Sequence, residues 1–100
     1  MIFNVRFTAE AQQDITRLYE FIFERDDTGY EAAQNALTAI RTGIDSLKHN
    51  PFSCRKTNTP FLRELVISFG ATGYVALFEI ESNKMVTVLA IRHQREEDYH

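Results

Sequence analysis

The stretch 61–92, FLRELVISFGATGYVALFEIESNKMVTVLAIR, decides the fold of this chain. Three runs rich in β-branched and aromatic residues occupy 61–67, 74–80 and 85–92. Two short polar connections separate them, and these contain the residues best suited to a positive φ: Gly70, Gly73 and Asn83. Strand-forming runs joined by such short turns predict an antiparallel meander.

Two segments upstream have apolar residues at helical spacing. The first helix is expected at 9–25, with Thr8 as its N-cap and Asp26–Asp27 ending it. The second is expected at 29–49 and opens with the spacing of a capping box that starts at Thr28. Because the connection between them is so short, the two helices should form an antiparallel hairpin.

With a short strand expected at 2–7, the chain has the order β-α-α-β-β-β. This order predicts an α+β fold in which the helical hairpin packs on one face of an antiparallel sheet of four strands. A length of 100 residues fits a single domain spanning 1–100. Ten apolar residues are expected in the core: Ile15, Leu18, Ile22, Leu37, Ile40, Ile44, Leu65, Ile67, Phe78 and Leu89.

The central strands are apolar at alternate positions on both sides, although one hairpin covers only one face of a sheet. Either loops and the C-terminal tail cover the second face, or it is a surface for a partner. We favour the partner, because little chain remains to cover this face. The residues expected to bind that partner are Val75, Leu77, Val86 and Val88.

Composition narrows the class of protein. A net charge of −3 does not favour a nucleic-acid-binding protein, although 48–63 holds four basic residues and no acidic one. No apolar run is long enough to span a membrane, and the start does not resemble a signal peptide. A single cysteine, Cys54, fits a reducing cytoplasm. No metal-ligand or phosphate-binding motif is present, so no cofactor is expected.

The residues that could carry chemistry gather at one end of the sheet and in the tail: Arg63, Glu64, Arg92, His93, Arg95, Tyr99 and His100. Arginine to hold phosphate, histidine or glutamate to move a proton and tyrosine to stack on a base are parts of a metal-free ribonuclease. The alternative is structural: surface charges, a strand cap and a pair between Arg95 and Glu97 or Asp98. Strand alternation puts Arg63 and Glu64 on opposite faces, so both cannot line one site.

The segments NPF (50–52), LRELV (62–66), YVALFEI (74–80) and VLAIRHQR (88–95), in this order, resemble the ParE/RelE superfamily of toxins. These are the toxins of bacterial type II toxin–antitoxin systems, and the resemblance covers essentially the whole chain. It implies two alternatives. RelE-like members cleave messenger RNA on the ribosome, whereas ParE-like members poison DNA gyrase through the last strand and tail.

The ending His93-Gln-Arg95 followed by acids looks like that of the ParE branch, with Glu96 where a second basic residue is more usual. We rank gyrase poison first, ribosome-dependent endoribonuclease second and an inactive antitoxin-binding relic third. A ParE-like chain is not an enzyme; it would bind its target through Arg92, His93, Arg95 and Tyr99. A nuclease would use Arg63, Glu64, Arg92, His93 and Tyr99. The resemblance also implies a cognate antitoxin, ParD-like with a ribbon-helix-helix domain, and no direct nucleic-acid binding outside the nuclease alternative.

Overall fold

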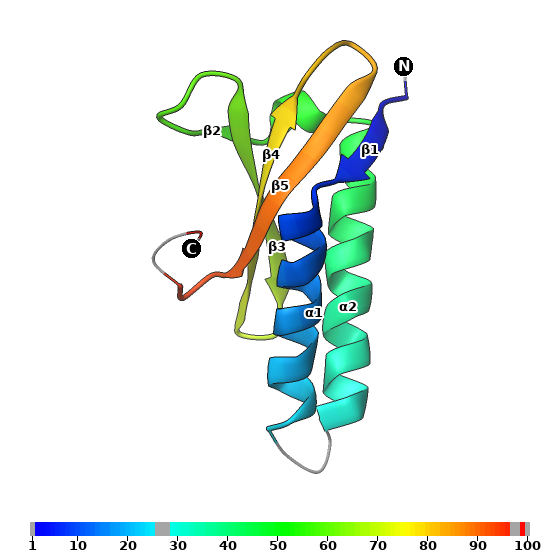
Figure 1. The fold of residues 1–100 in the computed structure, drawn as a ribbon, viewed down its shortest axis with the longest axis vertical. Helices are drawn as coiled ribbons and strands as arrows, with labels where there is room; N and C mark the ends of the chain where they lie inside the picture. Colours follow the sequence, from blue (N-terminus) through cyan, green and yellow to red (C-terminus); the bar gives the residue numbers. More distant parts are fainter. Residues whose placement is uncertain (1, 26–28, 97–98, 100) are drawn as a thin grey trace.

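The computed structural model describes residues 2–25, 29–96 and 99, and it confirms the α+β fold with a helical hairpin on a sheet (Figure 1). The expected helix-breaking and capping residues at 26–28 lie outside the described residues. No described helix is long and apolar enough to cross a membrane. The elements, in chain order, are β1 (Asn4–Phe7), α1 (Ala9–Phe23), α2 (Gly29–Asp45), the 3₁₀ turns Ser46–Lys48 and Pro51–Ser53, β2 (Arg55–Lys56), β3 (Leu62–Phe69), β4 (Thr72–Ile80) and β5 (Met85–His93).

The sheet has five strands in the order β1-β5-β4-β3-β2. Strands β3, β4 and β5 form the expected antiparallel meander, and Gly70 takes the positive φ in its first turn, at 61°. Two details differ from the prediction. Strand β1 pairs with β5 in parallel, which makes the sheet mixed, and the two-residue β2 adds a fifth strand beside β3. A four-residue strand carries too little pattern to reveal its partner or direction.

The helical hairpin lies against one face of the sheet, and the core forms between these two layers (Figure 1). Thr8 caps α1 as predicted, because its hydroxyl accepts the Ala11 N–H at 3.1 Å. Gly43 lets α2 approach β3 closely, since a Cβ there would lie 2.8 Å from Ile67. Five of the ten expected core residues are buried: Leu18, Ile40, Ile44, Ile67 and Phe78. The other five are only half-buried: Ile15, Ile22, Leu37, Leu65 and Leu89.

A register shift in β5 explains the position of Leu89. Leu77 pairs with Ala90 and Phe78 pairs with Val88, so Leu89 is an extra residue in a β-bulge. The bulge resets the alternation of the strand. Val86, Val88 and Ile91 all pack in the helix-facing core with no exposed surface. The prediction that Val86 and Val88 share the second face with Val75 and Leu77 is therefore wrong, because the register places them beside Phe78 and Ile80.

Where β1 ends, residues at the start of α1 make the hydrogen bonds to the edge of β5. The Thr8 N–H donates to the Val88 carbonyl at 3.0 Å, and its hydroxyl donates to the Leu89 carbonyl at 3.0 Å. Further along α1, the Asp14 carboxylate accepts the Ile91 N–H at 2.9 Å. Asp14 is 2% exposed, so its carboxylate is buried against the edge of β5 that lies beyond the last β1 pair, Phe7 with Val88.

Replacing Asp14 by Ala should lower the free energy of unfolding by about 1–3 kcal/mol, because the buried Ile91 N–H then has no acceptor. Asp14→Asn should cost less, since an amide oxygen can still accept this hydrogen bond. Urea unfolding of the purified variants measures both. Asp45→Ala, which removes an exposed acid from α2, is the control. Equal stability of Asp14→Ala and the control would show that the carboxylate has no structural role.

Candidate functional site

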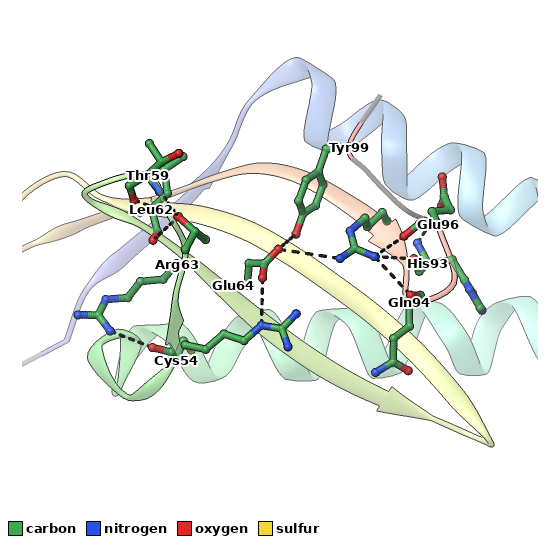
Figure 2. Close-up of polar contacts among 12 residues, drawn as sticks. Cys54, Thr59, Leu62, Arg63, Glu64, His93, Gln94, Glu96 and Tyr99 are labelled. Atoms are coloured by element: carbon green, nitrogen blue, oxygen red, sulfur yellow. Dashed lines mark hydrogen bonds and ion pairs between the residues drawn. The ribbon is translucent and has the colours of Figure 1, made fainter.

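Glu64 is the centre of a polar cluster on the sheet face opposite the helices (Figure 2). One of its carboxylate oxygens accepts Arg55 Nε at 3.0 Å, and the other accepts the Tyr99 hydroxyl at 2.6 Å. Arg92 Nη2 lies 4.0 Å from the same carboxylate. Three candidate site residues, Glu64, Arg92 and Tyr99, are therefore brought together by the structure, with one negative charge among two arginines.

Arg92 shapes the turn that follows β5. Its Nη1 donates to the carbonyls of Glu96 at 2.6 Å, His93 at 3.3 Å and Gln94 at 3.4 Å (Figure 2). Its guanidinium carbon lies 5.0 Å from the centre of the Tyr99 ring, a cation–π contact. The side chain is only 14% exposed. Arg92 therefore uses its hydrogen bonds to hold the protein's own backbone.

His93 is held on several sides at the end of β5. Its Nδ1 accepts the Arg95 N–H at 3.0 Å, and its Nε2 lies 3.2 Å from the Thr72 hydroxyl. The ring also packs edge-on against Tyr74, with centroids 5.6 Å apart. Because Nδ1 is an acceptor, the proton of the neutral ring lies on Nε2, which donates to Thr72. Neither ring nitrogen is left without a partner.

Glu96 ties the turn to α1. Its carboxylate accepts the backbone N–H of His93 at 2.9 Å and Arg17 Nη1 at 3.3 Å. Arg17 Nη2 lies 3.8 Å from the buried Asp14. The turn at 93–96 is thus clamped from the strand side by Arg92 and from the helix side by Arg17, while the Arg95 side chain stays exposed.

The environment of Tyr99 raises the pKa of its phenol well above the ordinary value, through burial first and the Glu64 carboxylate second. A phenol with a raised pKa stays neutral across the physiological range and cannot serve as a general base there. Burial likewise raises the pKa of the Cys54 thiol, which keeps it protonated and poorly nucleophilic. No group of three potential metal ligands occurs among the described residues.

The second face of the sheet is covered over β4, on the side toward β5, and more open over β3. Val75 is 1% exposed beside its cross-strand neighbour Arg92, whereas Val66 on the same face is 42% exposed. Leu77, which lies on the same face opposite Glu64, is half-buried. The protein's own C-terminal residues cover the side of this face near β5, and the binding of a partner to the remainder stays a prediction.

Arg63 is separate from the cluster, as strand alternation predicted. Its Nη1 donates to the carbonyls of Cys54 at 2.8 Å and Phe52 at 3.1 Å, on the opposite side of β3 from Glu64 (Figure 2). His100 lies outside the described residues. Arg55 belongs to the basic run at 48–63, but its pairing with Glu64 was missed, because this pairing depends on the two-residue strand β2. Thr72 and Glu96 were also missed, since only the folded turn brings them to His93.

A helical hairpin packed on a small mixed sheet is also the fold of two solved structures. The chain has a TM-score of 0.78 with a structure titled as the chromosomal ParDE TA system from P. aeruginosa, at 20% identity over 92% of this chain and 96% of that one. It has a TM-score of 0.60 with a double-arginine mutant of the E. coli toxin RelE in the free state, at 14% identity over 91% and 82% of the two chains.

The sequence comparisons agree. Residues 5–98 match the family described as the ParE toxin of the type II toxin–antitoxin system parDE. The chain is also 31% identical to Toxin RelE3 of Caulobacter vibrioides over 94 residues, which are 93% of this chain and 96% of the relative. The chain therefore belongs to the ParE toxin family, within the ParE/RelE superfamily, and is the toxin component of a type II toxin–antitoxin system. This confirms the resemblance found in the sequence, and a cognate antitoxin is its partner.

Replacing Glu64 by Gln should lower the pKa of Tyr99, because the negative carboxylate disfavours the phenolate beside it. The fall should be only partial, since burial is the larger cause of the raised value. NMR titration with ¹³C-labelled tyrosine follows each phenol separately. Glu10→Gln, an exposed change in α1, is the control. A Tyr99 titration unchanged by Glu64→Gln would show that the two side chains do not meet in solution.

Proposed function

We propose that this toxin acts by binding and poisoning DNA gyrase, and that it does not cleave messenger RNA. The proposal rests on one observation: each candidate catalytic group already makes contacts within the protein. Glu64 is shared by Arg55, Arg92 and Tyr99, and both ring nitrogens of His93 are engaged. Arg63 lies on the other side of the strand.

Ribonuclease chemistry requires groups that this arrangement does not supply. A general base needs a lone pair within reach of the substrate proton, and a phosphate clamp needs arginine donors aimed at solvent. Arg92 instead donates to three backbone carbonyls, and the Tyr99 phenol stays neutral. A net charge of −3 also provides a poor start for docking into ribosomal RNA, where many phosphate contacts are needed.

Binding to a target, by contrast, requires only a surface that fits it and no free catalytic group. The turn after β5 is rigidly clamped, and it presents the exposed Arg95 beside the half-buried ring of His93. Within the predicted target-binding set, Arg95, His93 and Tyr99 provide contacts, while Arg92 positions the turn. The proposed target and a ParD-like antitoxin with a ribbon-helix-helix domain both belong to the cytoplasm, which is the compartment we propose for the toxin.

The deciding experiment challenges two purified systems with the same toxin preparation: gyrase with plasmid and ATP, and ribosomes with messenger RNA. We expect gyrase inhibition and gyrase-dependent DNA breaks, with intact message. Arg95→Glu should weaken gyrase inhibition by about tenfold or more, equivalent to about 1.4 kcal/mol of binding free energy. Arg41→Glu, an equally drastic change at an exposed site on α2, should leave inhibition unchanged.

Ribonuclease activity is the second candidate, because one relative carries the name RelE3 and the fold is shared with RelE. Cleaved message with untouched gyrase would overturn the proposal in its favour. His93→Gln should then slow cleavage by roughly 10²–10⁴-fold if His93 is a general acid or base. A chain that binds its antitoxin but affects neither system would be an inactive relic.

A further inference from the structure

A second surface, unused by the proposed function, lies at the other end of the sheet. It is a groove of about 490 Å³ between the turn at 51–53, the β2–β3 loop and the β4–β5 hairpin, near the upper end of the sheet in Figure 1. Register separates it from the C-terminal turn. Leu62 in the groove pairs with Glu79 near the β4–β5 hairpin, whereas His93 pairs with Tyr74 at the opposite end of β4.

Phe61 is the main feature of this groove. Its side chain is 80% exposed, the highest value among the large exposed apolar residues of the described chain. Its φ of 72° is the one positive value among the described non-glycine residues, so the predicted Asn83 does not share it. A bulky residue rarely adopts this conformation, and such strain persists only where the surroundings enforce it.

The loop around Phe61 supplies that enforcement. The Leu62 N–H donates to the Thr59 carbonyl at 3.3 Å, and the Thr57 N–H donates to the Leu62 carbonyl at 3.3 Å. The Thr57 hydroxyl accepts the Thr59 N–H at 3.1 Å. These hydrogen bonds close the loop and hold the aromatic ring in solvent, an arrangement that gains apolar burial only when something covers the ring.

A second aromatic ring and two cations complete the groove. Phe52 is 59% exposed, and the Arg63 guanidinium carbon lies 5.6 Å from the centre of its ring. Lys56 and Arg63 both line the groove, and none of its lining residues is acidic. No described carboxylate forms an ion pair with either cation. The groove is therefore apolar at its centre and positively charged at its rim.

We propose that this groove docks a segment of the cognate antitoxin in which a large apolar side chain is flanked by carboxylates. The apolar side chain would cover Phe61 and Phe52, and the carboxylates would face Lys56 and Arg63. The inference rests on membership of the toxin family and is independent of which target the toxin poisons. The distance from the His93–Arg95 turn leaves the groove to the antitoxin instead of the target.

Single-stranded nucleic acid is the competing occupant for an aromatic and basic groove. The structure favours a peptide, because Arg63 Nη1 already donates to two carbonyls and cannot contribute a full fork to a phosphate. One lysine and one partly used arginine offer little counterion release, and the chain as a whole is negative.

The test uses the full toxin with the antitoxin encoded in the adjacent reading frame. Two variants alter the groove: Phe61→Gly, which removes the ring while suiting the positive φ, and Lys56→Glu, which reverses the charge. The matched controls are Tyr30→Ala, an aromatic residue that is 63% exposed on α2, and Arg41→Glu. We measure toxicity on induction, rescue by co-expressed antitoxin, and antitoxin affinity by calorimetry.

The expected result is a toxin that is still poisonous but poorly neutralised. Both groove variants should retain toxicity and lose antitoxin affinity by tenfold or more, and the controls should change it by less than about twofold. Retained toxicity also shows that the variant has folded. Full rescue with unchanged affinity would overturn the proposal. So would a folded groove variant that has lost toxicity, or a fluorescent oligonucleotide released by Lys56→Glu while antitoxin affinity stays the same.

Discussion

The hydrogen bond between the Asp14 carboxylate and the Ile91 N–H is the contact on which the arrangement of the site depends. Strand β1 ends before it can pair with that N–H, and the bulge at Leu89 places Ile91 on the helix-facing side. It also turns Arg92 toward the second face, where it meets Glu64 and Tyr99. One buried carboxylate thus ties α1 to the last strand beyond its bulge, and the register of that strand decides which side chains the C-terminal turn presents.

Around that turn, charge is used to hold the protein together. Arg92, Arg17 and Arg55 each contact a carboxylate, and Arg92 also donates to the carbonyls that follow it. Burying such a cluster has an unfavourable desolvation free energy, which several simultaneous hydrogen bonds offset. The benefit is a rigid turn, because neither the strand side nor the helix side can move without breaking charged contacts. Rigidity of this kind suits recognition of a partner, where an ordered surface loses little entropy on binding.

Much of the fold could be predicted from periodicity, because the meander and both helices are long enough to carry a clear pattern. The site was predicted less well, for a reason visible in Leu89. A single inserted residue moves every later side chain of the strand to the other face of the sheet. No local property of the sequence VLAIR shows where the insertion lies. The pairing of Arg55 with Glu64 could not be predicted for a related reason: a two-residue strand has no sequence pattern of its own. Composition did identify the basic run at 48–63, although its aromatic partners became evident only when the groove was assembled.

The two ends of the sheet carry similar residue types with opposite electrostatic outcomes. At the C-terminal end, Tyr99 and two arginines share Glu64, so the aromatic ring is half-buried and the positive charge is partly compensated. At the other end, Arg63 is anchored by carbonyl oxygens, which hold its position without cancelling its charge, and Phe61 remains in solvent. An arginine that is held in place by neutral acceptors therefore keeps its positive charge uncompensated, whereas a carboxylate that holds an arginine also compensates its charge. An acidic partner approaching this small, net-negative toxin would be drawn to the groove.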